Sequence, residues 1–307
     1  MQNLSNHNEN NIAYLHAMVV AGAVLFSLPL QFLQGNAQIF VGFLLPQLFY
    51  MIAVFVFVFA IKKAKTFKQI NNFIPVNKPK IGSLVLTLPA SIGMFCAFLI
   101  FGVSVSYIFA SFGINSAPVL PENQNIGLIF LTIFIVAVLP GVFEELFFRG
   151  LYLTALKDRG LVQTIVFSSL IFAFSHMNPL QIIYQFLLGA TLAFITIKTK
   201  SVIYAIIMHF LSNTFVIILP LFISFFAYIH IFSWANMVIM AIISFVGFTV
   251  LIPSTKFLIK FANKGEKIEE IAEKTENQPN IKRNLGIAFI CLLAFLILAT
   301  IVVAVAS

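Results

Sequence analysis

Long apolar runs, each about the length of a membrane-spanning helix, recur along almost the whole chain and constrain its fold more than any other feature. A helix that crosses the hydrocarbon core of a bilayer needs about 20 mostly apolar residues. Runs of this kind occupy residues 12–33, 38–61, 81–112, 126–148, 161–178, 180–197, 201–228, 233–253 and 286–306. Because helices satisfy their own backbone hydrogen bonds in lipid, the pattern predicts an all-α, polytopic transmembrane bundle of about eight to nine spanning helices.

The scarcity of charged residues supports a membrane location. Charged residues make up 9% of the 307 residues and hydrophobic residues 61%, whereas soluble domains carry about 25% charged residues. A soluble protein of this length could not cover its surface with so few charges. The two cysteines, Cys96 and Cys291, lie far apart in apolar runs, so the chain offers neither a disulfide framework nor a cysteine zinc site.

The positions of the 18 basic residues predict the orientation of the spans in the cell membrane. All of them fall in alternate connections, at 62–80, 149–159, 198–200 and 256–283, and the intervening connections carry none. Because basic loops are retained in the cytoplasm, we expect the N-terminus to be cytoplasmic and the C-terminus to lie outside. Basic loops also attract the headgroups of the lipid bilayer, which explains the net charge of +8 without a nucleic acid partner.

Ionisable side chains inside the predicted spans are few and concentrated. Such groups are costly in hydrocarbon and usually serve a function. The concentrated set comprises Glu144, Glu145, Arg149, His176 and His209, with Asn213 four residues after His209. His16 and His230 have no evident partner in the sequence, so we expect both to be structural.

A helical hairpin would bring the acidic and basic groups to one depth. The fourth run is predicted to bend at Pro140 and to continue into a tight turn, after which the fifth helix begins near Leu161. At 1.5 Å per residue, Glu144 and His176 both lie about 20–23 Å from this turn. They can therefore meet if they face the same way.

Two further pairs are spaced to share a helix face. Glu145 and Arg149 are four residues apart, as are His209 and Asn213, and side chains at this spacing are neighbours on a helix. A buried arginine needs a partner, and Glu145 is the nearest one. Together these groups predict a polar pocket in the cytoplasmic half of the bundle.

Such a pocket suits the hydrolysis of an amide by water. A carboxylate removed from water is a stronger base, so Glu144 could take a proton from a water molecule that His176 helps to hold. His209 and Asn213 could then donate hydrogen bonds to the oxyanion of the tetrahedral intermediate. This reaction needs no metal and no cofactor.

Other readings of the same residues remain open. The chain contains no HExxH or GxSxG motif and only one aspartate, Asp158, which removes the usual zinc helix, the serine elbow and an aspartate dyad. Glu144, His176 and His209 could instead bind zinc, because two histidines and a glutamate suit this metal. A transporter could use Glu and His as a proton relay, although we see no inverted repeat. Each histidine, or Asn213, could also be an interhelical hydrogen bond.

Three short motifs in this region resemble those of a known family. EELFFRG at 144–150 matches the EExxxR motif of the CAAX-protease and bacteriocin-processing (CPBP) family of intramembrane glutamate proteases, also called the abortive-infection family. FAFSH, from Phe172 to His176, matches its FxxxH motif, and HFLSN, from His209 to Asn213, matches its HxxxN motif. The motifs occur in the family's order on separate predicted helices, and the resemblance covers residues 138–215.

The resemblance implies an α-helical core whose site opens toward the cytoplasm and cleaves a membrane-associated peptide or protein without a metal. It assigns water activation to Glu144 and His176, the oxyanion hole to His209 and Asn213, and supporting roles to Glu145, Arg149 and Phe172. The family is mixed in function, because some members trim prenylated CAAX proteins, others process peptides or confer bacteriocin immunity, and others act as scaffolds. A hydrolase acting on peptide bonds is therefore our first expectation, and a non-proteolytic scaffold or immunity protein the alternative.

The apolar and charged segments also suggest how the chain is organised. We expect N-terminal spans and loops over residues 1–125 and a catalytic, family-like helical core over 126–228. The C-terminal spans are expected over 229–307, and they include a charged cytoplasmic linker at 254–285 that mixes glutamates with lysines.

Overall fold

The computed structural model describes residues 2–27, 29, 32–112, 125–222 and 234–264, and all of the regular elements in these ranges are helices. Five helical stretches are long and apolar enough to cross a membrane, and three shorter ones are also apolar. The longer stretches are Asn36–Ile61, Ile81–Phe109, Ile126–Arg159, Pro179–Thr199 and Ala235–Ala262, and the shorter ones are Asn10–Phe26, Leu161–Ser175 and Val202–Ile218. They coincide with the first eight predicted runs, which confirms the all-α polytopic bundle. The ninth run, 286–306, lies outside the described residues, as does His230.

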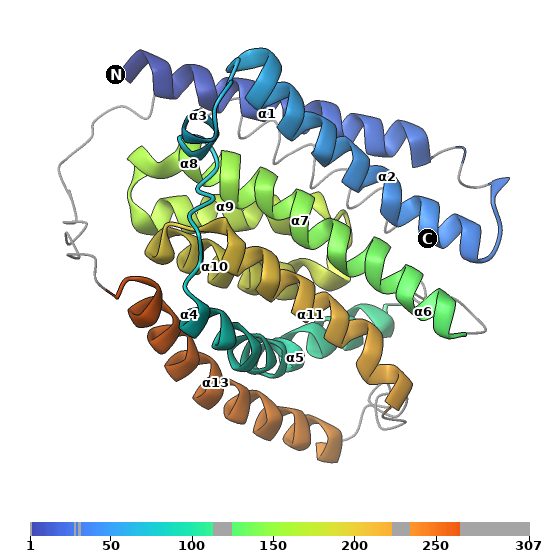
Figure 1. Ribbon diagram of the computed structural model, residues 1–307. Helices are drawn as coiled ribbons and strands as arrows, with labels where there is room; N and C mark the ends of the chain where they lie inside the picture. Colours follow the sequence, from blue (N-terminus) through green and yellow to red (C-terminus); the bar gives the residue numbers. More distant parts are fainter. Residues whose placement is uncertain (1, 28, 30–31, 113–124, 223–233, 265–307) are drawn as a thin grey trace.

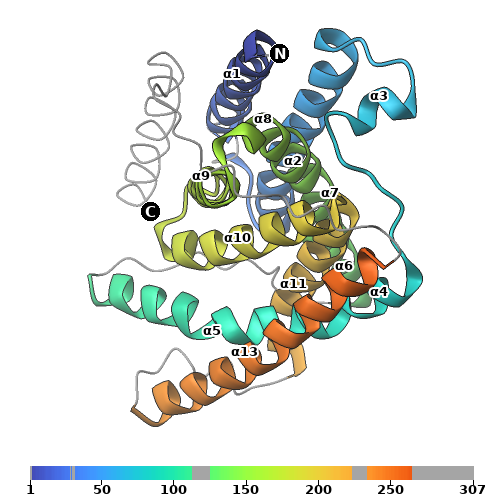
Figure 2. The same ribbon diagram turned by 90° about the vertical axis from the view of Figure 1, so that its left-hand side faces the viewer.

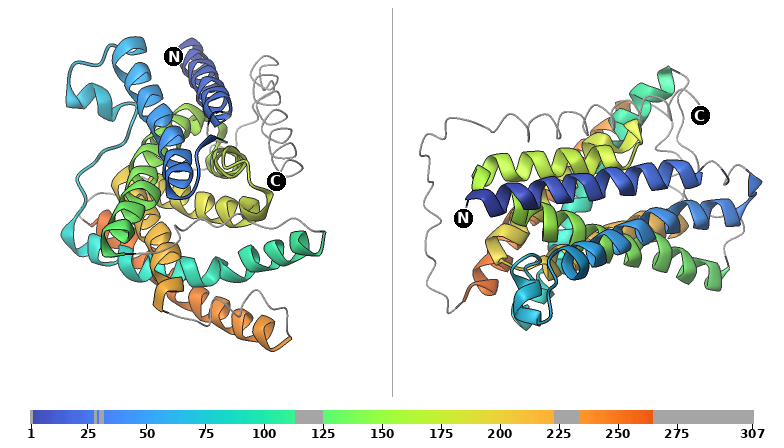
Figure 3. Two further views of the ribbon diagram at one scale, coloured as in Figure 1. Left: turned by 90° about the vertical axis from the view of Figure 1, so that its right-hand side faces the viewer. Right: turned by 90° about the horizontal axis from the view of Figure 1, so that it is seen from above.

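The helices stack in pairs that place the family-like segment at the centre of the bundle. α1 (Gln2–Ser27) packs against α2 (Asn36–Phe55) on one side, and α5 (Thr87–Ser111) packs against α13 (Trp234–Ala262) on the other. Between these pairs lie α7 (Leu139–Glu145), α9 (Leu161–Ser175), α10 (Ile182–Thr199) and α11 (Val202–Phe222). Figure 1 shows α1 and α2 above this central group and α5 and α13 below it, and the left panel of Figure 3 shows the same arrangement from the side.

The fourth span is one long helix that changes its winding around the candidate residues. It comprises α6 (Ile126–Thr132), the π-helix η3 (Ile133–Val138), α7, a second π-helix η4 (Leu146–Tyr152), α8 (Leu153–Leu156) and the short 3-10 helix η5 (Lys157–Arg159). Pro140 lies in the first turn of α7, directly after η3. A proline cannot donate its backbone hydrogen bond, and a π-helical segment is one way for a helix to absorb such a gap.

The predicted basic connections meet at one end of the bundle. The 62–80 connection contains the short helix α3 (Phe67–Asn71) and then pairs with the α10–α11 turn, where Val202 N donates to Pro75 O at 2.8 Å. Asn263 Nδ2 donates to Lys198 O at 2.9 Å, so the end of α13 joins the same group. In Figure 1, α3, α4 (Ile81–Val85), α8 and the end of α13 all lie on the left. This grouping agrees with the positive-inside prediction, which requires these connections to share one side.

The boundary predicted for the charged linker was wrong at its start. Residues 254–262 are not a linker but the last turns of α13, which continues to Ala262. The helix continues because Leu258 and Ala262 pack into the hydrophobic core beside α4. The rest of the predicted linker, from residue 265, lies outside the described residues.

Candidate active site

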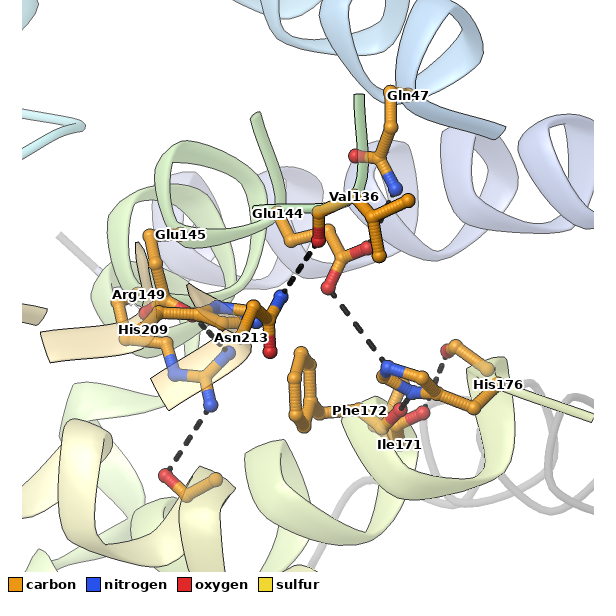
Figure 4. A network of polar contacts seen from close by, with 12 residues as sticks. Gln47, Val136, Glu144, Glu145, Arg149, Ile171, Phe172, His176, His209 and Asn213 are labelled. Atoms are coloured by element: carbon orange, nitrogen blue, oxygen red, sulfur yellow. Dashed lines mark hydrogen bonds and ion pairs between the residues drawn. The ribbon is translucent and has the colours of Figure 1, made fainter. Parts of the chain in front are cut away.

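Glu144 is a buried carboxylate at the centre of the bundle, on α7 between the two π-helical segments. Its Oε1 accepts a hydrogen bond of 2.7 Å from Gln47 Nε2 on α2. Its Oε2 faces His176 Nε2 at 4.0 Å, as Figure 4 shows, and has no hydrogen-bond partner among the described residues. The two oxygens of this carboxylate therefore differ, since one is held and the other is directed at a histidine.

His176 caps the C-terminus of α9 and presents one ring nitrogen to Glu144. Its Nδ1 lies 2.8 Å from Phe172 O, and because a carbonyl only accepts, Nδ1 carries the hydrogen. In the neutral ring, Nε2 is then an acceptor that faces the carboxylate. A separation of 4.0 Å is too long for a direct hydrogen bond, and it suits two acceptors that bind the same water molecule.

Glu145 contacts two buried side chains, those of His209 and Arg149. Its Oε1 lies 2.7 Å from His209 Nδ1 and 3.1 Å from Arg149 Nη1, and all three side chains are at most 2% exposed. Arg149 also lies with its guanidinium 4.1 Å from the centre of the Phe172 ring, and it donates to Gly189 O at 3.4 Å. This arrangement fixes His209 through Nδ1, so Nε2 is the ring nitrogen that could meet a ligand.

Asn213 lies on α11, one turn after His209, as predicted from the spacing. Its Nδ2 donates to Val136 O at 3.1 Å, and this carbonyl belongs to the π-helical segment η3. An amide nitrogen carries two hydrogens, so Asn213 retains a second donor. Figure 4 shows Asn213 close to both Glu144 and His209. The structure therefore gathers the four predicted catalytic residues and the three supporting ones in one cluster, in which His176 and Asn213 are partly exposed and the other five are buried.

His16 has partners that its sequence neighbourhood does not reveal. It is fully buried on α1, with Nδ1 2.9 Å from the Tyr152 hydroxyl and Nε2 2.9 Å from the Ser175 hydroxyl. Ser175 directly precedes His176, so this contact fastens α1 to the end of α9 beside the candidate site. The expectation that His16 has a structural role is compatible with these contacts, although the sequence did not show its partners. Its partners lie 136 and 159 residues away along the chain, beyond the reach of a local pattern.

Gln47 contacts Glu144 but was not among the predicted site residues. The prediction rested on ionisable groups inside apolar runs, and an uncharged amide is not one of them. A useful signal was nevertheless present, because a glutamine within the apolar run 38–61 must find a hydrogen-bond partner to be tolerated there.

The zinc alternative predicted a ligand set made from Glu144, His176 and His209. Within the part of the chain that the structure describes, no three His, Cys, Asp or Glu side chains are grouped so that they could hold a metal ion. His209 directs one nitrogen to Glu145 and His176 directs one to the Phe172 carbonyl. These three side chains are therefore held by other protein groups and do not form a common coordination site.

Comparison with known proteins supports the family resemblance over the central helices. Residues 126–215 match the sequence model of a family described as Type II CAAX prenyl endopeptidase Rce1-like. No curated protein and no solved structure matches the chain. The matched segment contains the three motifs and extends the predicted 138–215 resemblance back through α6, so the resemblance predicted from the motifs is confirmed.

Proposed function

From the match of residues 126–215 to a family of membrane-embedded CAAX prenyl endopeptidases, we propose that this protein is a metal-independent intramembrane glutamate endopeptidase. Its substrate is a membrane-associated protein or peptide, from which it hydrolyses a peptide bond. The observation that carries the proposal is the pair formed by Glu144 Oε2 and His176 Nε2. The two atoms are 4.0 Å apart, the glutamate is buried, and the histidine side chain is 21% exposed.

The pair acts on a water molecule held between its two acceptor atoms. As the water oxygen attacks the scissile carbonyl carbon, Glu144 takes one of the water protons as general base. The proton then passes to the nitrogen of the leaving amine as the carbon–nitrogen bond breaks. The products are one carboxyl and one amine terminus, and Glu144 returns to its ionised form without any covalent intermediate.

The negative charge on the carbonyl oxygen is stabilised by His209 Nε2 and the second hydrogen of Asn213 Nδ2. With Nδ1 bonded to Glu145, His209 donates from Nε2 only when both of its nitrogens carry hydrogen.

The orientation of the chain in the membrane belongs to the same proposal. Glu144 lies 15 residues before Arg159, the end of the long fourth helix, which corresponds to about 22 Å along a helix. We place this basic end in the cytoplasm, with the N-terminus on the same side. The catalytic core then spans residues 126–228, and substrates reach it from the cytoplasmic half of the membrane.

The test is a cleavage assay on the purified full chain in detergent, using a library of quenched peptides with and without EDTA. We expect the wild type to cleave in both conditions and Glu144→Gln to be inactive. Asp158→Asn is the matched control, because it also neutralises a carboxylate but lies in an exposed turn. Cleavage by Glu144→Gln at the wild-type rate would overturn the proposal, and loss of wild-type cleavage in EDTA would favour a metal site. A cellular phenotype that survives Glu144→Gln would indicate a non-proteolytic scaffold.

A further inference from the structure

Gln47 lies on α2, outside the segment that matches the peptidase family, yet it contacts the side chain on which the proposed chemistry depends. Its Nε2 donates to Glu144 Oε1 at 2.7 Å, and the residue is 4% exposed. Figure 4 shows Gln47 approaching Glu144 from the side opposite His176. The two neighbours of the carboxylate therefore come from different spans and meet it from different directions.

The packing of α2 does not explain an amide at this position. A buried amide loses its hydrogen bonds to water, and it is tolerated only as far as the protein replaces them. Gln47 Oε1 has no partner among the described residues, so only part of its hydrogen-bonding capacity is met. An apolar side chain of similar length would fill the same space but would leave Glu144 Oε1 without this donor, so the glutamine serves the carboxylate and not the packing of α2.

The hydrogen bond has a direct consequence for the geometry of Glu144. A carboxylate on a flexible side chain can rotate, and holding Oε1 at one fixed donor determines where Oε2 points. In the structure Oε2 points to His176 Nε2. A hydrogen bond from a donor to a carboxylate is also stronger than one between neutral groups, so the contact with Gln47 holds Oε1 firmly in place.

We propose that Gln47 is a positioning residue for Glu144, which extends the catalytic machinery into the second span. The proposal rests on the proposed function, because it assigns Gln47 a role in the same reaction. It differs from a packing role in what it requires of the side chain. Positioning requires a hydrogen-bond donor at this point, whereas packing between α2 and α7 requires only bulk of the right shape.

Two substitutions separate these roles, because the variant expected to be more active is not the one expected to be more stable. Gln47→Met keeps the length of the side chain and removes the donor, while Gln47→Glu keeps the shape and adds a carboxyl group. Two buried carboxyl groups at this distance share a proton, and the shared proton restores a donor to Glu144. We therefore expect Gln47→Glu to be the more active variant and Gln47→Met the more thermostable one.

The measurement is kcat and KM for the fastest peptide of the quenched library, together with the melting temperature in detergent. Gln47→Met should lower kcat by about 10- to 100-fold, as loss of a residue that orients a catalytic group does, with KM within about twofold of wild type. Gln47→Glu should recover most of that loss. Gln38→Met is the matched control, because Gln38 lies on the same helix and is exposed, and its kcat should equal that of wild type.

Each result decides the question. A Gln47→Met protein as active as wild type, or more active than Gln47→Glu, overturns the positioning role while Glu144→Gln remains inactive and the proposed function stands. If the wild type cleaves no peptide, or Glu144→Gln still cleaves, the proposed function fails and the role of Gln47 fails with it. Should Gln47→Glu not fold, the kcat of Gln47→Met measured against Gln38→Met decides alone.

Discussion

At the scale of single residues, Glu145 combines a structural and a chemical task. It pairs with Arg149 and it holds His209 by Nδ1. Removing one partner of a buried ion pair leaves an uncompensated charge, whereas replacing both partners with apolar groups is often neutral for stability. The two tasks of Glu145 can therefore be separated by mutation.

Glu145→Leu should lower the free energy of unfolding by about 3–5 kcal/mol because Arg149 is left buried without its counter-charge. The double variant Glu145→Leu/Arg149→Met should regain most of this stability. It should nevertheless cleave at least ten times more slowly than wild type, because His209 has lost the carboxylate that orients it. Thermal unfolding in detergent and the quenched-peptide assay measure the two effects. Wild-type cleavage by the double variant would show that Glu145 and Arg149 form a purely structural pair.

His16 offers a second test at this scale, since its contacts tie the first span to the end of α9. His16→Phe keeps an aromatic ring but removes the bonds to Tyr152 and Ser175. We expect a loss of about 1–3 kcal/mol, the usual result of removing a buried hydrogen-bond partner, together with a lower kcat because His176 follows Ser175. Tyr14→Phe is the control, because Tyr14 lies on the same helix and is 66% exposed. Equal melting temperatures for the two variants would contradict this account.

The candidate residues could be predicted where helix spacing or the helical hairpin related them to one another. The spacing of Glu144, Glu145 and Arg149 and of His209 and Asn213 needed only the period of a helix, and the hairpin set the depth of His176. Gln47 was not found because its contact with Glu144 joins positions 97 residues apart. No rule of helix spacing reaches between spans, so which face of α2 meets α7 is decided only by packing of the whole bundle.

At the scale of helices, glycines set how closely α5 and α13 approach. A Cβ atom added at Gly93 would lie 2.6 Å from Leu251 N, and one added at Gly247 would overlap Ala97 N. Backbone atoms cannot rotate away as a side chain can, so either addition forces the two helices apart. Small residues at such contacts are the usual way in which membrane helices pack tightly.

Gly247→Ala should therefore destabilise the protein by about 1–3 kcal/mol, the range for overpacking a tight contact, and Gly93→Ala should behave in the same way. The control is Gly102→Ala on α5, where the new Cβ would meet Tyr184 at an ordinary 3.8 Å. Melting temperatures of the three variants in detergent measure the effect. If Gly247→Ala had the same melting temperature as Gly102→Ala, α5 and α13 could move apart without a loss of stability.

The sequence predicted which segments are helices, but it did not predict where a helix changes its winding or where it ends. Apolar length was enough to locate the first eight spans, because hydrocarbon imposes it. The two π-helical segments around α7 were not predicted, since a helix that is apolar on every side shows no periodicity from which its winding could be read. The end of α13 was missed because Lys256 and Lys260 are exposed beside buried Leu258, and their charges were interpreted as the start of a linker.

At the scale of the whole molecule, the alternation of basic and neutral connections agrees with the two ends of the bundle. The described parts of the connections that carry lysine and arginine lie at the end where α3, α4 and α8 lie, and the α1–α2 connection lies at the other, as Figure 1 shows. Figure 2 views the bundle from the basic end. Retention of basic loops in the cytoplasm produces a bundle with basic connections at one end and connections without basic residues at the other. This agreement makes the orientation of the whole protein open to a direct experiment.

Single cysteines at the two ends should react from opposite sides of the membrane. In a background of Cys96→Ser and Cys291→Ser, we expect Lys65→Cys, Lys157→Cys and Lys256→Cys to resist a membrane-impermeant maleimide in intact cells and to react after permeabilisation. Gln34→Cys, in the α1–α2 connection, should react in intact cells. All four positions are exposed, so protection reports the side of the membrane and not burial. Labelling of the three basic positions in intact cells would place Glu144 nearer the outer face, and substrates would then have to be sought outside the cell. A mixed pattern among those three would contradict the shared end at which α3, α8 and the end of α13 lie in Figure 1.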